Sequence, residues 1–310
     1  MAGVELYAPR KPRHRRTWTI AAIVLSVAFV VLGQVLAILP AMGMGWFSEA
    51  GESWGQLAYT LAAAFGLGAA LTIGWVAVFE RRGLATIGFN ANGLKRFVRG
   101  YLIGMGFLLA AVGVIWLAGG YAVEGPGAFG TAAVGAALLP IGVLMLGFII
   151  QGSTEEIVFR GWLMQLIASR HGLWPAVIGN SLLFSLMHAG NIEPSRELAI
   201  GLANIVLFGL FISLYAAREG SLWGVCGWHA AWNWLLGLGF GLEVSGQVVE
   251  ATPLIADLTT TAGSAWWLTG ASFGPEASLV VTAILTAGTV YLAVRGRTKD
   301  HGVEAAEAAA

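Results

Sequence analysis

The sequence has 310 residues and a formal net charge of zero, with 57% hydrophobic and only 11% charged residues. Soluble domains usually carry about 25% charged residues, so this composition excludes an ordinary soluble domain. A zero net charge argues against a nucleic-acid partner. The single cysteine, Cys226, excludes an internal disulfide and a metal site built from several cysteines. We therefore expect a helical protein whose surroundings are the lipid bilayer.

Apolar stretches of about 20 residues, long enough to cross a bilayer as helices, recur along the whole chain. They predict an all-α fold, namely a polytopic integral membrane bundle of about eight transmembrane helices. The predicted spans are Trp18–Leu39, Leu57–Phe79, Tyr101–Leu117, Met145–Ile167, Trp174–Ala189, Leu198–Ala217, Leu222–Leu242 and Leu279–Val294.

The basic residues predict how the bundle is oriented. Lys and Arg are enriched in the cytoplasmic segments of membrane proteins, and here they precede the first span, follow the last and lie in alternate connections. Arg196 is the exception, because it lies among the mainly acidic connections of the opposite side. We therefore expect both termini in the cytoplasm and the protein in the cell membrane. The basic residues on the predicted cytoplasmic side are Lys11, Arg13, Arg15, Arg16, Arg81, Arg82, Lys95, Arg96, Arg99, Arg170, Arg218, Arg295, Arg297 and Lys299.

The chain divides into three predicted parts without a soluble domain. Residues 1–125 form N-terminal membrane helices, with an amphipathic segment at 83–100 that we expect to lie along the membrane interface. Residues 126–245 form a catalytic membrane core. Residues 246–310 supply the end of a long polar loop on the outer side (243–276), the last membrane helix and a cytoplasmic tail.

Several polar side chains lie inside the predicted spans of the central part. An ionisable group at bilayer depth costs roughly 2.5–3.5 kcal/mol on insertion scales unless it faces a polar interior, so such groups are usually functional. Carboxylates together with imidazoles are typical of acid–base hydrolysis. The residues concerned are Glu155, Glu156, Arg160, His188, His229 and Asn233.

The spacing of these residues allows them to meet. Glu155 and His188 lie about equally far from the short connection between the fourth and fifth spans, so an antiparallel pair places them at similar depth. His229 and Asn233 are four residues apart and share one helical face. Each residue alone has a structural reading, as an interhelical hydrogen bond or, for Glu156 with Arg160, as an ion-pair clamp. Their convergence from three helices favours a functional site.

These residues form three motifs that resemble those of the CAAX protease and bacteriocin-processing family of intramembrane endopeptidases, which includes the type II CAAX prenyl proteases. The family motifs are EExxxR, FxxxH and HxxxN. Here they read Glu155–Arg160, Phe184–His188 and His229–Asn233, in the same order along the chain. The resemblance covers about residues 130–242.

The resemblance implies hydrolysis of a peptide or protein substrate at the membrane, with the C-terminal region of a prenylated protein as one candidate. It implies that Glu155 is the general base that activates water and that His188 positions or polarises this water. His229 and Asn233 would stabilise the oxyanion of the tetrahedral intermediate. Glu156, Arg160 and Phe184 would support the site.

The need for a metal stays open at this stage. Glu156, His188 and His229 could ligate zinc and leave one position for water, although no HExxH motif is present. We favour chemistry without a cofactor, because a third strong ligand is hard to name once Glu155 acts as the base.

Two other functions compete with peptide hydrolysis. Glutamate and histidine residues inside a membrane also build proton relays, so a proton-coupled transporter is one alternative. Such a protein would be expected to contain inverted repeats or interrupted helices, and the sequence shows neither clearly. The other alternative is a non-catalytic membrane scaffold or bacteriocin self-immunity protein that retains the motifs for packing.

Overall fold

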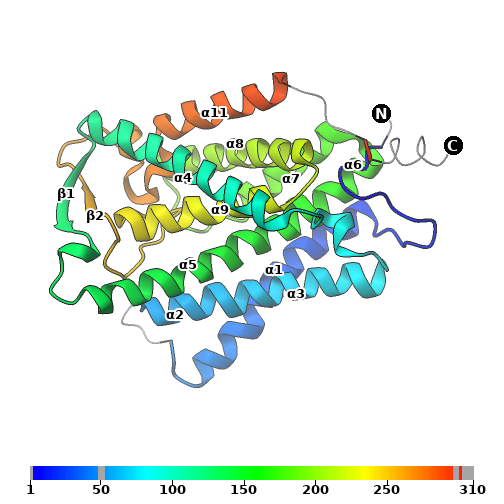
Figure 1. The fold of residues 1–310 in the computed structure, drawn as a ribbon, viewed down its shortest axis with the longest axis horizontal. Coiled ribbons are helices and arrows are strands. Elements are labelled where there is room, and N and C mark those ends of the chain that lie inside the picture. Colours follow the sequence, from blue (N-terminus) through cyan, green and yellow to red (C-terminus); the bar gives the residue numbers. More distant parts are fainter. Residues whose placement is uncertain (1–2, 48–52, 296–299, 302–310) are drawn as a thin grey trace.

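The computed structural model describes residues 3–47, 53–295 and 300–301. Over these residues the fold is the all-α membrane bundle expected from the sequence, with its helices lying along one another and a small two-stranded sheet at one end (Figure 1). The basic residues Arg297 and Lys299 and the tail from residue 302 lie outside the described residues.

Each predicted span contains a helix. Five helical segments are long and apolar enough to cross a membrane, whereas α7 and α11 are apolar but shorter. Three of the helical segments contain π-helical parts. In the first, residues 60–64 join α2 to α3 and residues 75–79 follow α3. In the other two, residues 157–164 join α5 to α6 and residues 235–239 follow α9. The helices are α1 (Thr19–Gly43), α2 (Trp54–Tyr59), α3 (Phe65–Gly74), α4 (Gly93–Leu117), α5 (Val134–Glu156), α6 (Gln165–His171), α7 (Leu173–Leu186), α8 (Arg196–Glu219), α9 (Trp223–Trp234), the single turn α10 (Trp266–Thr269) and α11 (Leu279–Val294).

The outer surface of the bundle is apolar, as a lipid-facing surface must be. In α1, Ile20 and Leu39 are exposed, and so are Leu102 and Leu117 in α4 and Leu146 in α5. A soluble monomer rarely exposes contiguous apolar patches of this kind. The exposed side chains therefore agree with an integral membrane protein.

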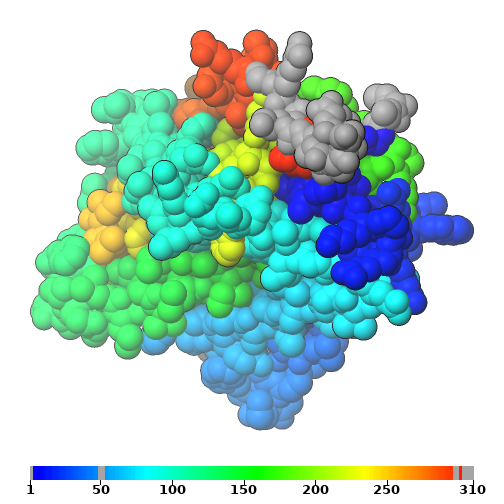
Figure 2. Space-filling view, turned by 45° about the vertical axis from the view of Figure 1, so that its right-hand side comes forward, coloured from blue at the N-terminus to red at the C-terminus, as the bar shows by residue number. Residues whose placement is uncertain are grey.

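The N-terminal segment and the described end of the chain lie at the same end of the bundle (Figure 1). The N–H of His301 donates to the carbonyl of Glu5 at 3.0 Å, and the N–H of Ala8 donates to the carbonyl of Ala85 at 3.3 Å. Figure 2 shows this dark blue N-terminal segment lying against the cyan part of the chain. Arg82 is buried there in an ion pair with Glu80. The common location of both ends agrees with the predicted topology, and which side of the membrane they face stays a prediction.

Two features between the spans differ from the expectation. The segment 83–100 does not form a separate interfacial helix, because a short 3₁₀ turn at Leu84–Ile87 leads into α4, which begins at Gly93 and continues as a membrane helix. The long polar loop contains strand β2 (Ala256–Thr260), which pairs antiparallel with β1 (Tyr121–Pro126) at the far end of the bundle. Both strands are short, so neither gives a clear alternation of apolar and polar residues.

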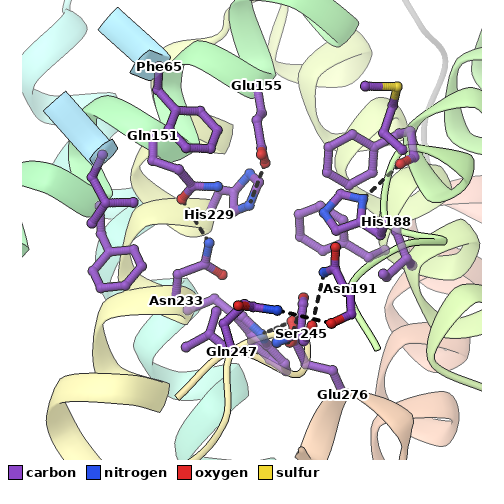
Figure 3. Close-up of a pocket in the computed structure, with 18 of the residues that line it drawn as sticks. Phe65, Gln151, Glu155, His188, Asn191, His229, Asn233, Ser245, Gln247 and Glu276 are labelled. Atoms are coloured by element: carbon purple, nitrogen blue, oxygen red, sulfur yellow. Dashed lines mark hydrogen bonds and ion pairs between the residues drawn. The ribbon is translucent and has the colours of Figure 1, made fainter. Parts of the chain in front are cut away.

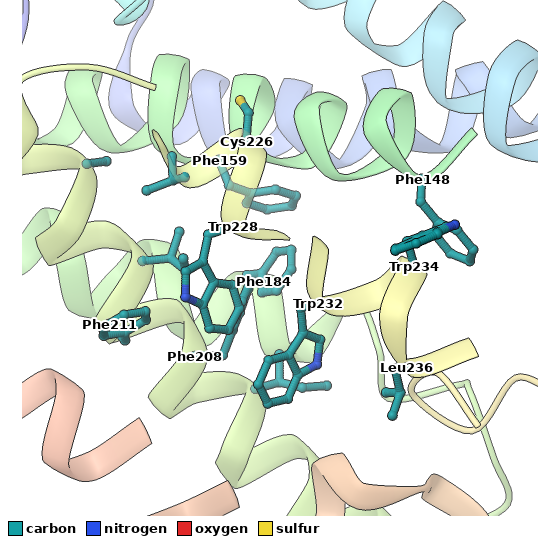
Figure 4. Close-up of a cluster of buried hydrophobic side chains, with 14 of the residues drawn as sticks. Phe148, Phe159, Phe184, Phe208, Phe211, Cys226, Trp228, Trp232, Trp234 and Leu236 are labelled. Atoms are coloured by element: carbon teal, nitrogen blue, oxygen red, sulfur yellow. The ribbon is translucent and has the colours of Figure 1, made fainter. Parts of the chain in front are cut away.

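Helix α9 carries the last motif and lies at the centre of the packing. All its residues from Gly224 to Trp234 are buried. Large aromatic side chains from neighbouring helices surround it, and Trp228 stacks on Trp232 with ring centres 5.0 Å apart (Figure 4). On its other side α4 approaches so closely that a Cβ on Gly100 would overlap the carbonyl oxygen of Gly224. Helix α9 is thereby held rigidly at the place where its polar residues are needed.

This close contact predicts that Gly100→Ala destabilises the bundle. The added methyl group meets backbone atoms that cannot turn away, so α4 and α9 must separate, at a cost of about 1–3 kcal/mol. Gly106→Ala is the matched control, since no atom lies within 4 Å of a Cβ at that position in the same helix. Unfolding in detergent should show a lower stability for Gly100→Ala alone. Equal stabilities of the two variants would contradict the packing described here.

Candidate active site

The polar residues of the three motifs meet at one cavity of about 590 Å³ (Figure 3). Its walls come from α1, the α2–α3 segment, α5, α7, α8 and α9, and its floor includes the loop at residues 244–249. Glu155, His188, His229 and Asn233 all line this cavity. The structure therefore brings together the four side chains that the sequence analysis singled out for catalysis.

Glu155 and Glu156 end α5, where the backbone changes to the π-helical segment Ile157–Met164. Single π-helical turns occur frequently at functional sites. Both carboxylates are buried, but Glu156 has no exposed surface, whereas Glu155 retains 9% exposure and lines the cavity. Two adjacent residues of the same type therefore face different surroundings.

The imidazole of His229 lies between these two carboxylates. Its Nδ1 is 2.9 Å from Oε1 of Glu156, and its Nε2 is 3.4 Å from Oε2 of Glu155. A carboxylate can only accept, so Nδ1 carries a hydrogen and donates it to Glu156. The absence of a side chain at Gly152 permits this approach, because a Cβ there would lie 3.3 Å from Cγ of His229. The ring is thus fixed with Nε2 towards Glu155.

Arg160 neutralises Glu156, as the spacing predicted. Its Nη1 donates to Oε1 of Glu156 at 3.1 Å, and neither side chain has exposed surface. The guanidinium group also lies over the ring of Phe184, with Cζ 4.3 Å from the ring centre. This cation–π contact offsets part of the cost of burying the charge. Phe184 therefore supports the site through Arg160.

His188 lies on the wall opposite Glu155 (Figure 3). Its Nδ1 is 2.9 Å from the carbonyl oxygen of Phe184, one helical turn earlier. Since a carbonyl oxygen only accepts, Nδ1 is the donor, and Nε2 of the neutral ring is an acceptor. His188 is half-buried. It is therefore placed to accept a hydrogen bond from a molecule held in the cavity.

The cavity also contains polar residues that the sequence analysis did not single out, among them Gln151 and Glu276. Gln151 accepts a hydrogen bond from Nδ2 of Asn233 at 2.9 Å. Glu276, from the predicted outer loop, accepts from Nε1 of Trp232 at 3.0 Å and from Oγ of Ser245 at 2.8 Å. A signal existed for Gln151, because it precedes Glu155 by one helical turn in an apolar helix. No local signal points to Glu276, whose partners are distant in the chain.

The zinc ligand set considered above is not gathered in the structure. Glu156 and His229 contact each other, but the described residues contain no group of three or more His, Cys, Asp or Glu side chains arranged to hold a metal ion. Glu156 is already committed to Arg160 and His229. The arrangement therefore does not fit a metal held by Glu156, His188 and His229.

The buried ion pair predicts a characteristic pattern of stabilities. Arg160→Met leaves the Glu156 carboxylate buried without its cation, which should cost about 3–5 kcal/mol. The double variant Glu156→Gln/Arg160→Met contains no unpaired charge, and its amide oxygen still accepts from His229, so it should recover most of this loss. Unfolding in detergent measures both effects. A double variant no more stable than Arg160→Met would contradict the charge-pairing argument.

Comparison with known proteins gives one match. Residues 137–235 match a family model described as type II CAAX prenyl endopeptidase Rce1-like. Searches of curated proteins and of solved structures found no match. The matched segment contains the three motifs and both helices, α5 and α9, that hold the carboxylates and His229. Residues 137–235 are therefore similar to the Rce1-like family of type II CAAX prenyl endopeptidases, in agreement with the motifs, and this family implies a membrane endopeptidase.

Proposed function

We propose that this protein hydrolyses a peptide bond inside the membrane with a water molecule activated by Glu155. The observation that carries this proposal is the position of Glu155, which lies in a cavity large enough for a peptide segment and 3.4 Å from Nε2 of His229. A general base must lie within reach of the proton that it removes, in a site where bulk water does not compete. The buried wall formed by α5 and α9 meets this requirement.

In the proposed reaction Glu155 takes a proton from the water as the water oxygen attacks the carbonyl carbon of the peptide bond. His188, on the opposite wall, accepts a hydrogen bond from this water through Nε2 and holds it in line. The C–N bond then breaks as Glu155 passes the proton to the leaving amine. Water is thus divided between the new carboxyl group and the new amino group.

The oxyanion of the tetrahedral intermediate is stabilised by His229 and Asn233, which are four residues apart on one face of α9. With a hydrogen on each ring nitrogen, His229 donates Nδ1–H to Glu156 and presents Nε2–H beside Glu155. One such donor is typically worth about 3–4 kcal/mol in the transition state. Asn233 lines the same cavity and adds an amide donor.

The walls of the cavity fit a substrate that is partly apolar. Val30, Val31 and Val35 of α1 and Leu57 and Leu61 of the α2–α3 segment line the cavity together with the polar groups of α5 and α9. We propose a peptide or protein that reaches the site from the membrane, with the C-terminal region of a prenylated protein as a candidate. Following the positive-inside rule, we place both termini in the cytoplasm and the protein in the cell membrane.

The role of Glu155 predicts that Glu155→Gln abolishes cleavage without unfolding the protein. Loss of a general base typically lowers the rate by roughly 10²–10⁴-fold. Cleavage of candidate peptides by purified protein measures the effect. Glu193→Gln is the control, because it makes the same chemical change at an exposed site. Wild-type cleavage by a folded Glu155→Gln variant would rule out this mechanism and favour a different catalyst.

The proposed reaction also predicts that a chelator leaves cleavage unchanged, because the side chains of this chain perform every step. Purified protein should be assayed before and after dialysis against a chelator, with its metal content measured in parallel. The prediction would be contradicted if activity and bound metal were lost together and activity returned when zinc was added.

A further inference from the structure

We infer that Gln151 is a positioning residue that orients the amide of Asn233 towards the reacting carbonyl, an inference that rests on the proposed function. Gln151 lies on α5, one helical turn before Glu155, and lines the same cavity. It belongs to none of the three motifs, and the sequence analysis assigned it no role. Figure 3 shows its side chain directed at Asn233.

The contact between the two amides is direct and buried. Oε1 of Gln151 accepts a hydrogen bond from Nδ2 of Asn233 at 2.9 Å, and the two residues are only 8% and 7% exposed. Figure 3 shows the two side chains pointing at each other across the gap between α5 and α9, beside His229. The acceptor therefore comes from the same helix as the general base.

This contact decides what Asn233 can offer to a substrate. A side-chain amide has two N–H donors and one acceptor oxygen, and the end of the group can rotate by half a turn. An Asn233 oxygen turned towards an oxyanion would repel it, whereas an N–H would stabilise it. When Gln151 accepts one N–H, the amino end of the group is fixed on the α5 side, and the second N–H remains available beside His229.

A purely structural role explains this contact less well. Helices α5 and α9 are already joined at His229, which is bonded to Glu156 and packed against Gly152. An amide pair used only to hold two helices together could lie anywhere along their contact. Here it lies on the cavity wall, one turn from Glu155 along α5 and one turn from His229 along α9.

The inference predicts that Gln151→Met lowers kcat about 10-fold while KM changes less than about 2-fold. The side chain keeps its length but loses the acceptor, so Asn233 loses its orientation, which is part of the 10²–10³-fold effect of a whole oxyanion donor. In Gln151→Asn the side chain is shorter by one carbon, so its amide oxygen no longer reaches Asn233 and kcat should fall in the same way. This variant replaces Gln151→Met if the latter does not fold. Steady-state cleavage of one peptide by purified protein measures both parameters.

A double-mutant cycle separates positioning from packing. If Gln151 acts through Asn233, then Gln151→Met should cost less than about 2-fold in kcat when Asn233 is already alanine. Gln165→Met is the matched control, because Gln165 is also buried but bonds the N-terminal segment at Leu6, far from the cavity. This control should lower the unfolding temperature and leave kcat unchanged.

The outcomes distinguish this inference from the function on which it rests. The inference is wrong if folded Gln151→Met has the wild-type kcat, or if Gln151→Met lowers kcat equally in the wild-type and Asn233→Ala backgrounds. In either case an inactive Glu155→Gln variant still supports the proposed function. Undiminished cleavage by Glu155→Gln overturns the proposed function, and the inference falls with it.

Discussion

The arrangement of the whole site depends on one buried charge pair, between Glu156 and Arg160. Two adjacent carboxylates inside a membrane protein would repel each other and would be costly to bury. Because Arg160 neutralises Glu156 at 3.1 Å, Glu156 remains a hydrogen-bond acceptor of fixed position. It can then hold Nδ1 of His229, and the opposite ring nitrogen is directed at Glu155. Through His229, the ion pair thereby fixes the surroundings of Glu155, which it does not contact.

The helices around this pair leave little freedom for it to change. Helix α9 must lie close to α5 for His229 to reach both carboxylates, and glycine at position 152 avoids the tight contacts that a Cβ would make there, 3.1 Å from the backbone nitrogen of Ala230 and 3.3 Å from Cγ of His229. On the other side of α9 the contact is much closer, because a Cβ on Gly100 of α4 would overlap the carbonyl oxygen of Gly224. Small residues allow membrane helices to pack through dispersion forces, which act in lipid where the hydrophobic effect does not. Here the same contacts hold α9 in place from both sides.

The sequence predicted the parts of this structure that follow from local periodicity. Helices form at every apolar span, and the Glu156–Arg160 pair follows from their spacing of four residues. The shared cavity of Glu155 and His188 follows from the short connection between α6 and α7. The partners of Asn233 and Trp232 could not be predicted, because Gln151 and Glu276 lie 82 and 44 residues away in the chain. The pairing of β1 with β2 joins segments that are farther apart still, since Tyr121 pairs with Thr260. Such contacts depend on how the helices pack, which no single-helix pattern contains.

The two glutamates show how one residue type can serve two purposes at neighbouring positions. Adjacent residues on a helix point about 100° apart, and of these two glutamates Glu155 lines the cavity and Glu156 does not. Glu156 points into the protein, where Arg160 and His229 use one of its oxygens. Glu155 points into the cavity, and its neighbour is the ring of His229, whose Nε2 lies 3.4 Å from Oε2 of Glu155, and not an arginine. The two glutamates therefore differ in their surroundings: Glu156 is held inside the protein by Arg160 and His229, and Glu155 is the one of the two that can contact a molecule in the cavity.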